Sequence, residues 1–344
     1  MSEPLLGHLD PAFLAIADEV QSLLRELFGT RNPLTLPLAA TGSGGMQACF
    51  TNLLEPGDRV VIGVAGVFGE RMCDVATRLG AHVTRVETAW ATALSEDALI
   101  EAIARVRPRA VAMVHAETST GVLQPIERTA RAARESGALV ILDCVTSLAG
   151  LPVALDAWGT DAAYSGTQKC LSAPPGLSPV SFSPRALEHI AARRTPVSSW
   201  YFDATLLAGY YGRERSYHHT APISAIFGLR KTLQQVKEEG YEARFERHRR
   251  AAAYLISELE ALGFTPLVKA EERLPMLTAL RLPEHVLRAG EASVRRRLLN
   301  EHGIEVGGGL GKLAGSIWRV GLMGENARES CVDTLVSALR RALT

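Results

Sequence analysis

The sequence YSGTQKCLSAPPG, residues 164–176, sets one lysine among small, turn-forming and hydroxyl residues between two apolar runs. Lys169 needs an explanation, because long charged side chains are rarely buried without a partner. A buried amine loses proton affinity by desolvation and becomes a nucleophile near neutral pH, as Schiff-base chemistry requires. Taken alone, the segment is equally typical of a surface lysine in a Gly/Pro loop.

The run GALVILDCVTSLAG, residues 137–150, supplies the context, because it has the pattern of a buried parallel strand with Asp143 at its carboxyl end. Ligands of open α/β sheets bind beyond the carboxyl ends of strands. Asp143 is therefore expected at the same crevice as Lys169, which follows a second predicted strand at 161–165. A strand-end aspartate is also common as a turn former or helix cap. The Asp–Lys pair fits pyridoxal phosphate, which uses a lysine aldimine and an acidic partner for its pyridinium nitrogen.

With these two strands in place, the chain resembles the fold-type I, class V aminotransferases, and among them most closely the alanine–glyoxylate and serine–pyruvate aminotransferases. The resemblance covers nearly the whole chain, and its motifs are specific jointly although each alone is weak. Besides the aspartate strand, the matching stretches are RNPLTLPLAATGSGG (31–45), NLLEPGD (52–58), HAETSTGVLQP (115–125), SGTQK (165–169), SAPPG (172–176), YHHT (217–220) and WRVGLMG (318–324).

Length and composition limit the number of domains and the classes of partner that the chain can have. A chain of 344 residues that is 47% hydrophobic can bury a sizeable core in about two domains. The 37 basic and 37 acidic residues balance, which gives no electrostatic reason to expect nucleic acid or a membrane surface as a partner. The five cysteines form no C-x-x-C pair, so neither a zinc site nor a disulfide framework is indicated, and no secretory signal or membrane span is evident. We therefore expect a cytoplasmic protein.

The order of predicted elements indicates an α/β fold. From residue 58 onward, apolar strands alternate with helical patterns, which favours a largely parallel sheet covered on both faces. The resemblance implies a fold-type I pyridoxal phosphate transferase with a seven-stranded sheet in a large domain, residues 1–240. A long helix from about 241 to 262 opens a small α+β domain, residues 241–344. Relatives carry a longer amino-terminal arm that helps to close the substrate site, and this sequence is expected to start after it.

A phosphate site is predicted at ATGSGG, residues 40–45, ahead of a helix expected from residue 46. Consecutive glycines let backbone amides approach an anion, and a helix amino terminus adds about half a positive charge. A Gly-rich turn without a ligand is the alternative. The resemblance implies that Ser43, Gly44, Gly45 and Gln168 hold the cofactor phosphate, with Gly45 lacking the larger side chain that some relatives have there.

Two residues after strand ends are candidates for contacts with the cofactor ring. Phe68 is by composition more typical of a core, but relatives stack an aromatic ring on the pyridine face at this position. Thr118 is implied as the contact to the ring hydroxyl, although a hydroxyl there could equally cap a helix. His115, in the same stretch, is expected to be structural.

The YHHT segment suggests an oligomer. Neighbours on an extended strand face opposite ways, so His218 and His219 are not expected to form a metal site, and we expect no metal in this protein. The resemblance assigns Tyr217 and Thr220 to the phosphate of the partner subunit's cofactor, which implies a homodimer with shared active sites.

Arg319 lies in the strand-like run SIWRVGL, where it is either a solvated residue on an edge strand or a bidentate ligand for a carboxylate. The resemblance implies that it binds the substrate α-carboxylate. The nearby GGGLGK run, residues 307–312, is expected to be a turn.

The sequence thus predicts a pyridoxal phosphate aminotransferase that moves an amino group from alanine or serine to glyoxylate or pyruvate, with Lys169 as the aldimine lysine and general base and Asp143 as the partner of the pyridine nitrogen. The alternatives are a lyase or desulfurase on the same fold, and a non-catalytic chain with an incomplete amino-terminal arm. Pocket contacts decide between donors that differ by one hydroxyl, and the sequence does not rank them.

Overall fold

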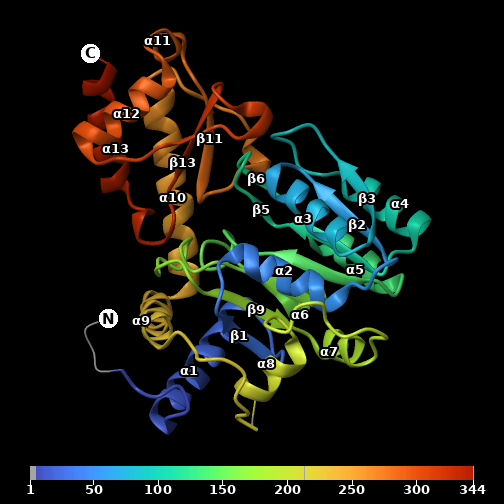
Figure 1. Ribbon diagram of the computed structural model, residues 1–344. Helices are drawn as coiled ribbons and strands as arrows, with labels where there is room; N and C mark the ends of the chain where they lie inside the picture. Colours follow the sequence, from blue (N-terminus) through green and yellow to red (C-terminus); the bar gives the residue numbers. More distant parts are fainter. Residues whose placement is uncertain (1–4, 213, 344) are drawn as a thin grey trace.

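The computed structural model describes residues 5–212 and 214–343, in which a seven-stranded, a four-stranded and a two-stranded β-sheet are formed (Figure 1). The large sheet has seven strands, and it agrees with the predicted sheet. Its strands are β1 (Leu34–Leu38), β2 (Arg59–Val64), β3 (His82–Glu87), β4 (Ala110–Val114), β7 (Leu139–Asp143), β8 (Ala162–Tyr164) and β9 (Ser178–Phe182). Their spatial order is β1-β9-β8-β7-β4-β2-β3. The five strands from β8 to β3 are parallel, whereas β9 runs antiparallel to both of its neighbours.

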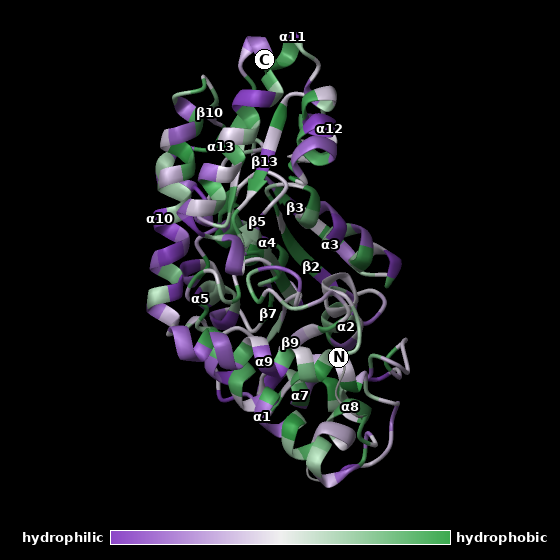
Figure 2. Ribbon diagram, turned by 90° about the vertical axis from the view of Figure 1, so that its left-hand side faces the viewer, coloured by the Kyte–Doolittle hydropathy of each residue, from purple (hydrophilic) through white to green (hydrophobic). Residues whose placement is uncertain are grey.

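Helices cover both faces of this sheet, which explains why its central strands read as continuous apolar runs. In β4 and β7 every residue is buried. Figure 2 shows the hydrophobic strands enclosed by helices whose outer faces are hydrophilic. The helices of this part are α1 (Pro11–Phe28), α2 (Gly42–Leu53), α3 (Val67–Arg78), α4 (Glu96–Val106), α5 (Glu127–Glu135), α6 (Leu155–Trp158), α7 (Pro184–Ala191), α8 (Ala204–Tyr211) and α9 (Ile223–Glu239).

Side-chain caps fix the starts of four of these helices, α1, α4, α7 and α8. The Asp10 carboxylate accepts a hydrogen bond of 2.8 Å from the amide of Ala12 at the start of α1, as the Asp-Pro pair predicts. The hydroxyl of Ser95 accepts one of 3.3 Å from the amide of Ala98 at the start of α4. Helix α2 differs from the prediction, because it begins at Gly42 rather than at residue 46. Glycine has a low helix propensity, so the pattern of the sequence concealed the first turn.

The carboxyl-terminal part forms a second hydrophobic core around the small sheet. That sheet is antiparallel, in the order β10 (Thr265–Pro266), β11 (Leu277–Arg281), β13 (Ile317–Gly321) and β12 (Gly307–Gly308). Helices α10 (Tyr241–Glu260), α11 (Glu284–Arg288), α12 (Glu291–His302) and α13 (Glu329–Leu343) pack around it. Gly240, with φ of 85°, separates α9 from α10. We therefore propose that the domain boundary lies at Gly240.

The remaining elements are short. A two-stranded ladder joins β5 (Ala116–Glu117) to β6 (Val122–Leu123). The 3₁₀ turns are η1 (Ala270–Glu272), η2 (Gly311–Leu313) and η3 (Gly324–Asn326). The GGGLGK run, residues 307–312, was expected to be a turn, but its first two residues form strand β12, and η2 begins only at Gly311. Over residues 5–212 and 214–343, no helix is long and apolar enough to cross a membrane.

Candidate active site

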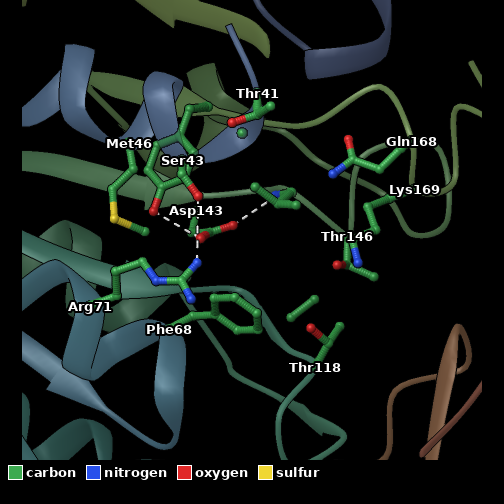
Figure 3. A pocket seen from close by; sticks show the side chains of 14 residues that line it. Thr41, Ser43, Met46, Phe68, Arg71, Thr118, Asp143, Thr146, Gln168 and Lys169 are labelled. Carbon is green, nitrogen blue, oxygen red and sulfur yellow. Dashed lines mark hydrogen bonds between the residues drawn. The ribbon is translucent and has the colours of Figure 1, made fainter. Parts of the chain in front are cut away.

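A pocket lies at the carboxyl ends of the central strands, where the parallel sheet was expected to bind a ligand (Figure 3). It brings together residues from five separate parts of the chain. Of the predicted site residues, it is lined by Ser43, Phe68, Thr118, Asp143, Gln168 and Lys169. The other lining residues are Thr41, Gly42, Met46, Arg71, Ala116, Val145, Thr146 and Tyr164.

Asp143 is the buried acid of this pocket, with 4% of its surface exposed at the end of β7. One carboxylate oxygen, Oδ1, accepts a hydrogen bond of 2.8 Å from the amide of Val145. The other, Oδ2, accepts one of 2.8 Å from the hydroxyl of Tyr164 on the neighbouring strand β8. Burial raises the pKa of Asp143 to about 7, and these two hydrogen bonds oppose that rise only in part. Such a carboxylate has a strong preference for a cationic partner.

Lys169 lies in the loop after β8 and points into the pocket rather than out of a surface loop (Figure 3). Burial lowers the pKa of its amine. Bonds on both sides hold the loop: the hydroxyl of Thr167 donates to the carbonyl of Pro174 at 2.7 Å, and the buried Arg244 donates through Nη2 to the carbonyl of Cys170 at 2.7 Å. The backbone is therefore held by hydrogen bonds at Thr167, two residues before Lys169, and at Cys170, one residue after it.

The amino terminus of α2 faces the pocket through Thr41, Gly42 and Ser43. Thr41 is the N-cap residue, but its side chain makes no capping hydrogen bond. A helix start of this kind offers amide groups and a partial positive charge to an anion.

Gly44 and Gly45, by contrast, do not line the pocket, and their predicted contact with a phosphate would have to come through the backbone. A Cβ added at Gly45 would lie 2.0 Å from Ser178 Oγ and 3.1 Å from the Cβ of Tyr164. Ser178 Oγ itself donates to the carbonyl of Ser165 at 2.6 Å. The glycine therefore allows α2 to pack closely on β8 and β9.

Phe68 and Arg71 form the wall opposite Lys169 (Figure 3). Both come from the first turns of α3, and the guanidinium carbon of Arg71 lies 5.1 Å from the centre of the Phe68 ring. Nη1 of Arg71 is 3.5 Å from Ser43 Oγ. The analysis of the sequence missed Arg71. Its spacing of three residues from Phe68 is the signal that could have found it, because residues at i and i+3 share a helix face.

Arg319 lies next to the pocket without lining it. Strand β13 is hydrogen-bonded to β11 on one side and β12 on the other, so the edge-strand alternative is wrong. Nε of Arg319 donates to the carbonyl of Gly308 at 2.8 Å, and Nη1 donates to the carbonyl of Thr118 at 3.2 Å. The arginine thus connects the small sheet to a residue of the pocket.

The YHHT segment lies outside the pocket, and Tyr217 and Thr220 are exposed. The expectation that the two histidines face opposite ways is wrong. The segment is not a strand, and Nδ1 of His218 lies 2.7 Å from Nδ1 of His219. The ring of His218 also stacks on that of Trp200, with centroids 4.4 Å apart. In the described part of the chain, no group of three or more His, Cys, Asp or Glu side chains could hold a metal ion.

His115 is buried between the sheet and α6, as expected for a structural residue. Its ring makes an edge contact with Trp158 at 5.1 Å between centroids. Burial lowers the pKa of His115 to about 4, so the ring is neutral at physiological pH.

Comparisons with known proteins agree with this geometry. The model of the family "Aminotransferase class-V" matches residues 6–327. A crystal structure of an alanine–glyoxylate aminotransferase from Nostoc sp. superposes with a TM-score of 0.97 at 50% identity, covering 99% of this chain and 90% of that chain. The (S)-ureidoglycine–glyoxylate transaminase of Bacillus subtilis is 38% identical, in an alignment that covers 100% of this chain and 86% of that protein. The alanine–glyoxylate aminotransferase of Callithrix jacchus is 38% identical, over 98% of this chain and 82% of its own.

Proposed function

The chain belongs to the class-V aminotransferase family, and we propose that it transfers the amino group of a small L-amino acid, alanine or serine, to glyoxylate or pyruvate. It is an aminotransferase that depends on pyridoxal 5′-phosphate. The relatives named above share glyoxylate in their names but differ in the donor, which is alanine or (S)-ureidoglycine. The acceptor is therefore better supported than the donor.

The pocket fits this cofactor in three chemical respects. Asp143 is a buried carboxylate, and no Lys, Arg or His side chain of residues 5–212 and 214–343 forms an ion pair with it. The start of α2 offers amide groups to a phosphate, and Lys169 supplies a half-buried amine. When bound, pyridoxal phosphate supplies an aldehyde that takes up the amino group and a ring that withdraws electrons from the substrate carbon. The observation that carries the proposal is this convergence of acid, anion site and amine in one pocket.

Asp143 would hold the proton on the pyridine nitrogen. A carboxylate whose pKa is raised by burial regains its charge when a cation pairs with it, so the acid and the ring nitrogen stabilise each other's charged form. Tyr164 would keep the carboxylate oriented through its bond to Oδ2. The remaining contacts that we propose for the cofactor are Ser43, Gly44, Gly45 and Gln168 at the phosphate, Phe68 on the ring face and Thr118 at the ring hydroxyl.

Lys169 would bind the cofactor covalently and then act as the general base. The lowered pKa of its amine increases the fraction of neutral Nζ, which is the form that attacks a carbonyl. Once substrate has displaced it, Nζ would take the proton from the substrate Cα and return it as a general acid. The anchored loop would keep the backbone of Lys169 at the same place in both steps.

Arg319 would hold the α-carboxylate of the substrate. Its guanidinium is half-buried and donates to two backbone carbonyls, and it has no carboxylate partner within 4.0 Å in the part of the chain that the structure describes. A guanidinium that is bonded only to neutral groups retains its charge for an incoming anion, which it can bind with two parallel hydrogen bonds.

Tyr217 and Thr220 support a homodimer, because their predicted role at a phosphate cannot be met in their own pocket. Tyr217 is 65% exposed and Trp200 61% exposed, as large side chains are at an unformed interface. We propose that both residues of the YHHT segment complete the partner's site. The five free cysteines, four of them buried, suit a reducing compartment and support the cytoplasmic location proposed here.

A half-transamination experiment tests the proposed reaction. Excess L-alanine or L-serine, without an acceptor, should convert the yellow, lysine-bound cofactor to its colourless amine form, and glyoxylate or pyruvate should restore the colour. Absence of any colour change with a panel of amino acids, including (S)-ureidoglycine, would contradict it. Release of ammonia or sulfide instead would favour a lyase or a desulfurase. The lack of a cysteine in the pocket lining disfavours the desulfurase, which would need one to accept the sulfur.

A further inference from the structure

Helix α3, which carries Phe68, begins without a cap from its own sequence. The N-cap residue is Gly66, which has no side chain, and a Cβ there would lie 2.3 Å from Ser119 Oγ and 2.7 Å from the Cδ of Glu117. These two residues supply the cap across a sequence separation of about fifty residues. The amide of Val67 donates to Ser119 Oγ at 3.0 Å, and those of Phe68 and Gly69 donate to Glu117 Oε2 at 3.2 and 3.4 Å.

Glu117 is a buried carboxylate, with 1% of its surface exposed, and all of its hydrogen-bond partners are donors. Its second oxygen, Oε1, accepts from the amide of Ser119 at 3.1 Å and from the Ser119 hydroxyl at 2.5 Å. Burial raises the pKa of Glu117, and these bonds oppose the rise. The positive end of the α3 dipole also favours the ionised form. Its buried charge is therefore compensated by the same helix start that it caps.

The two capping residues flank a residue of the pocket. Along residues 117–119, the outer side chains contact α3, and Thr118 between them faces the pocket. The carbonyl of Thr118 also accepts the bond from Arg319. Residues 117–119 thus contact or contain three proposed site residues, Phe68, Thr118 and Arg319.

We infer that Glu117 and Ser119 are positioning residues, which fix the first turn of α3 so that the Phe68 ring is held against the ring of the bound cofactor. The inference rests on the proposed role of Phe68 at the cofactor. Neither capping side chain lines the pocket, so each acts through α3 rather than by contact with the cofactor. A cap that only stabilised the fold would lower the melting temperature and leave binding of the cofactor unchanged.

The test is a double-mutant cycle on release of pyridoxamine phosphate, the form of the cofactor that is not bonded to Lys169. The variants are Glu117→Gln, Phe68→Ala and the pair, and the measurement is the release rate from the dilute holoenzyme. We expect Glu117→Gln to release it about fivefold faster, which corresponds to about 1 kcal/mol of lost ring contact. In the Phe68→Ala background, the same substitution should change the rate by less than about twofold.

Ser119→Ala provides a second route to the same loss and is the variant to use if Glu117→Gln folds poorly. The matched control is Ser95→Ala, which removes the cap of α4 and should lower the melting temperature without changing the release rate. Two results would overturn the inference, provided that Phe68→Ala itself accelerates release of pyridoxamine phosphate. The first is that Glu117→Gln accelerates release equally in the parent and in the Phe68→Ala background. The second is that Glu117→Gln does not accelerate release in the parent. Release by Phe68→Ala at the parent's rate would instead refute the stacking role on which the inference rests.

Discussion

Replacing Asp143 with asparagine should stabilise the cofactor-free protein above neutral pH relative to the parent, although it removes a charge from the active site. Burial raises the pKa of Asp143 to about 7, against 3.8 for a free aspartate. Between these values the folded protein keeps the proton and the unfolded chain releases it. The stability that protonated Asp143 gives is therefore complete below pH 3.8 and is lost as the pH rises through 7.

The size of the effect follows from the width of this interval. Each pH unit in which only the folded state holds the proton costs about 1.4 kcal/mol of unfolding free energy. From pH 5 to pH 8 the parent should lose about 3 kcal/mol relative to Asp143→Asn, because the amide does not titrate and the loss ends near pH 7. Taking the difference between the two proteins cancels the contribution of all groups that titrate alike in both.

The measurement is urea unfolding of both cofactor-free proteins at a series of pH values. Tyr164→Phe is a useful companion, since removal of the hydroxyl that bonds to Oδ2 should raise the pKa of Asp143 further and move the loss to higher pH. Saturation of the parent with cofactor should flatten the curve, because a cation then pairs with the carboxylate. Parallel stability curves for the parent and Asp143→Asn would refute the reasoning.

Three further substitution experiments address the proposed roles of individual residues. Lys169→Ala should bind pyridoxal phosphate without a covalent bond, so borohydride should no longer fix the cofactor to the chain; labelling of another lysine in the mutant would contradict the assignment. Arg319→Lys should lower kcat/KM by about tenfold or more for every α-amino acid with the spectrum of the bound cofactor unchanged, because a point charge replaces a bidentate fork, and unaltered kinetics would place the arginine outside the site. Mixing of Lys169→Ala chains with chains that carry both Tyr217→Phe and Thr220→Ala should restore about a quarter of the sites if the two residues act across a two-fold interface. Activity equal to the mean of the parents, in subunits shown to exchange, would mean that they act within their own chain.

The central sheet, Asp143 and Lys169 could be predicted from the sequence, because strands of a parallel sheet have a recognisable pattern and bind ligands at their carboxyl ends. Strands buried on both faces read as apolar runs, and β7 ends at Asp143 while β8 ends just before the loop of Lys169. Their parallel pairing brings the two residues to one edge. Class membership and the cofactor followed from this pair together with the motifs, and the comparisons confirmed both.

The missed residues depend on contacts between distant segments. The only signal for Arg71 is its spacing of three residues from Phe68, and its contact with Ser43 leaves no trace in the sequence. Glu117 carries no local signal, since it caps α3 from strand β5, about fifty residues away. The contact between His218 and His219 was also beyond prediction, because it requires a non-extended backbone held by the stacked ring of Trp200. Periodicity describes which face of an element is buried, but it does not describe which element lies opposite.

The close approach of Gly45 to Ser178 makes these two positions of the chain depend on each other. Any side chain at position 45 would collide with the Ser178 hydroxyl at 2.0 Å and with its Cβ at 3.0 Å. A larger residue at position 45 would therefore require the Ser178 hydroxyl to turn away or α2 to move off β9. A glycine at position 178 would remove the contact, so the cost of a substitution at position 45 is expected to depend on the residue at position 178. The two positions must be changed together in any redesign of this helix start.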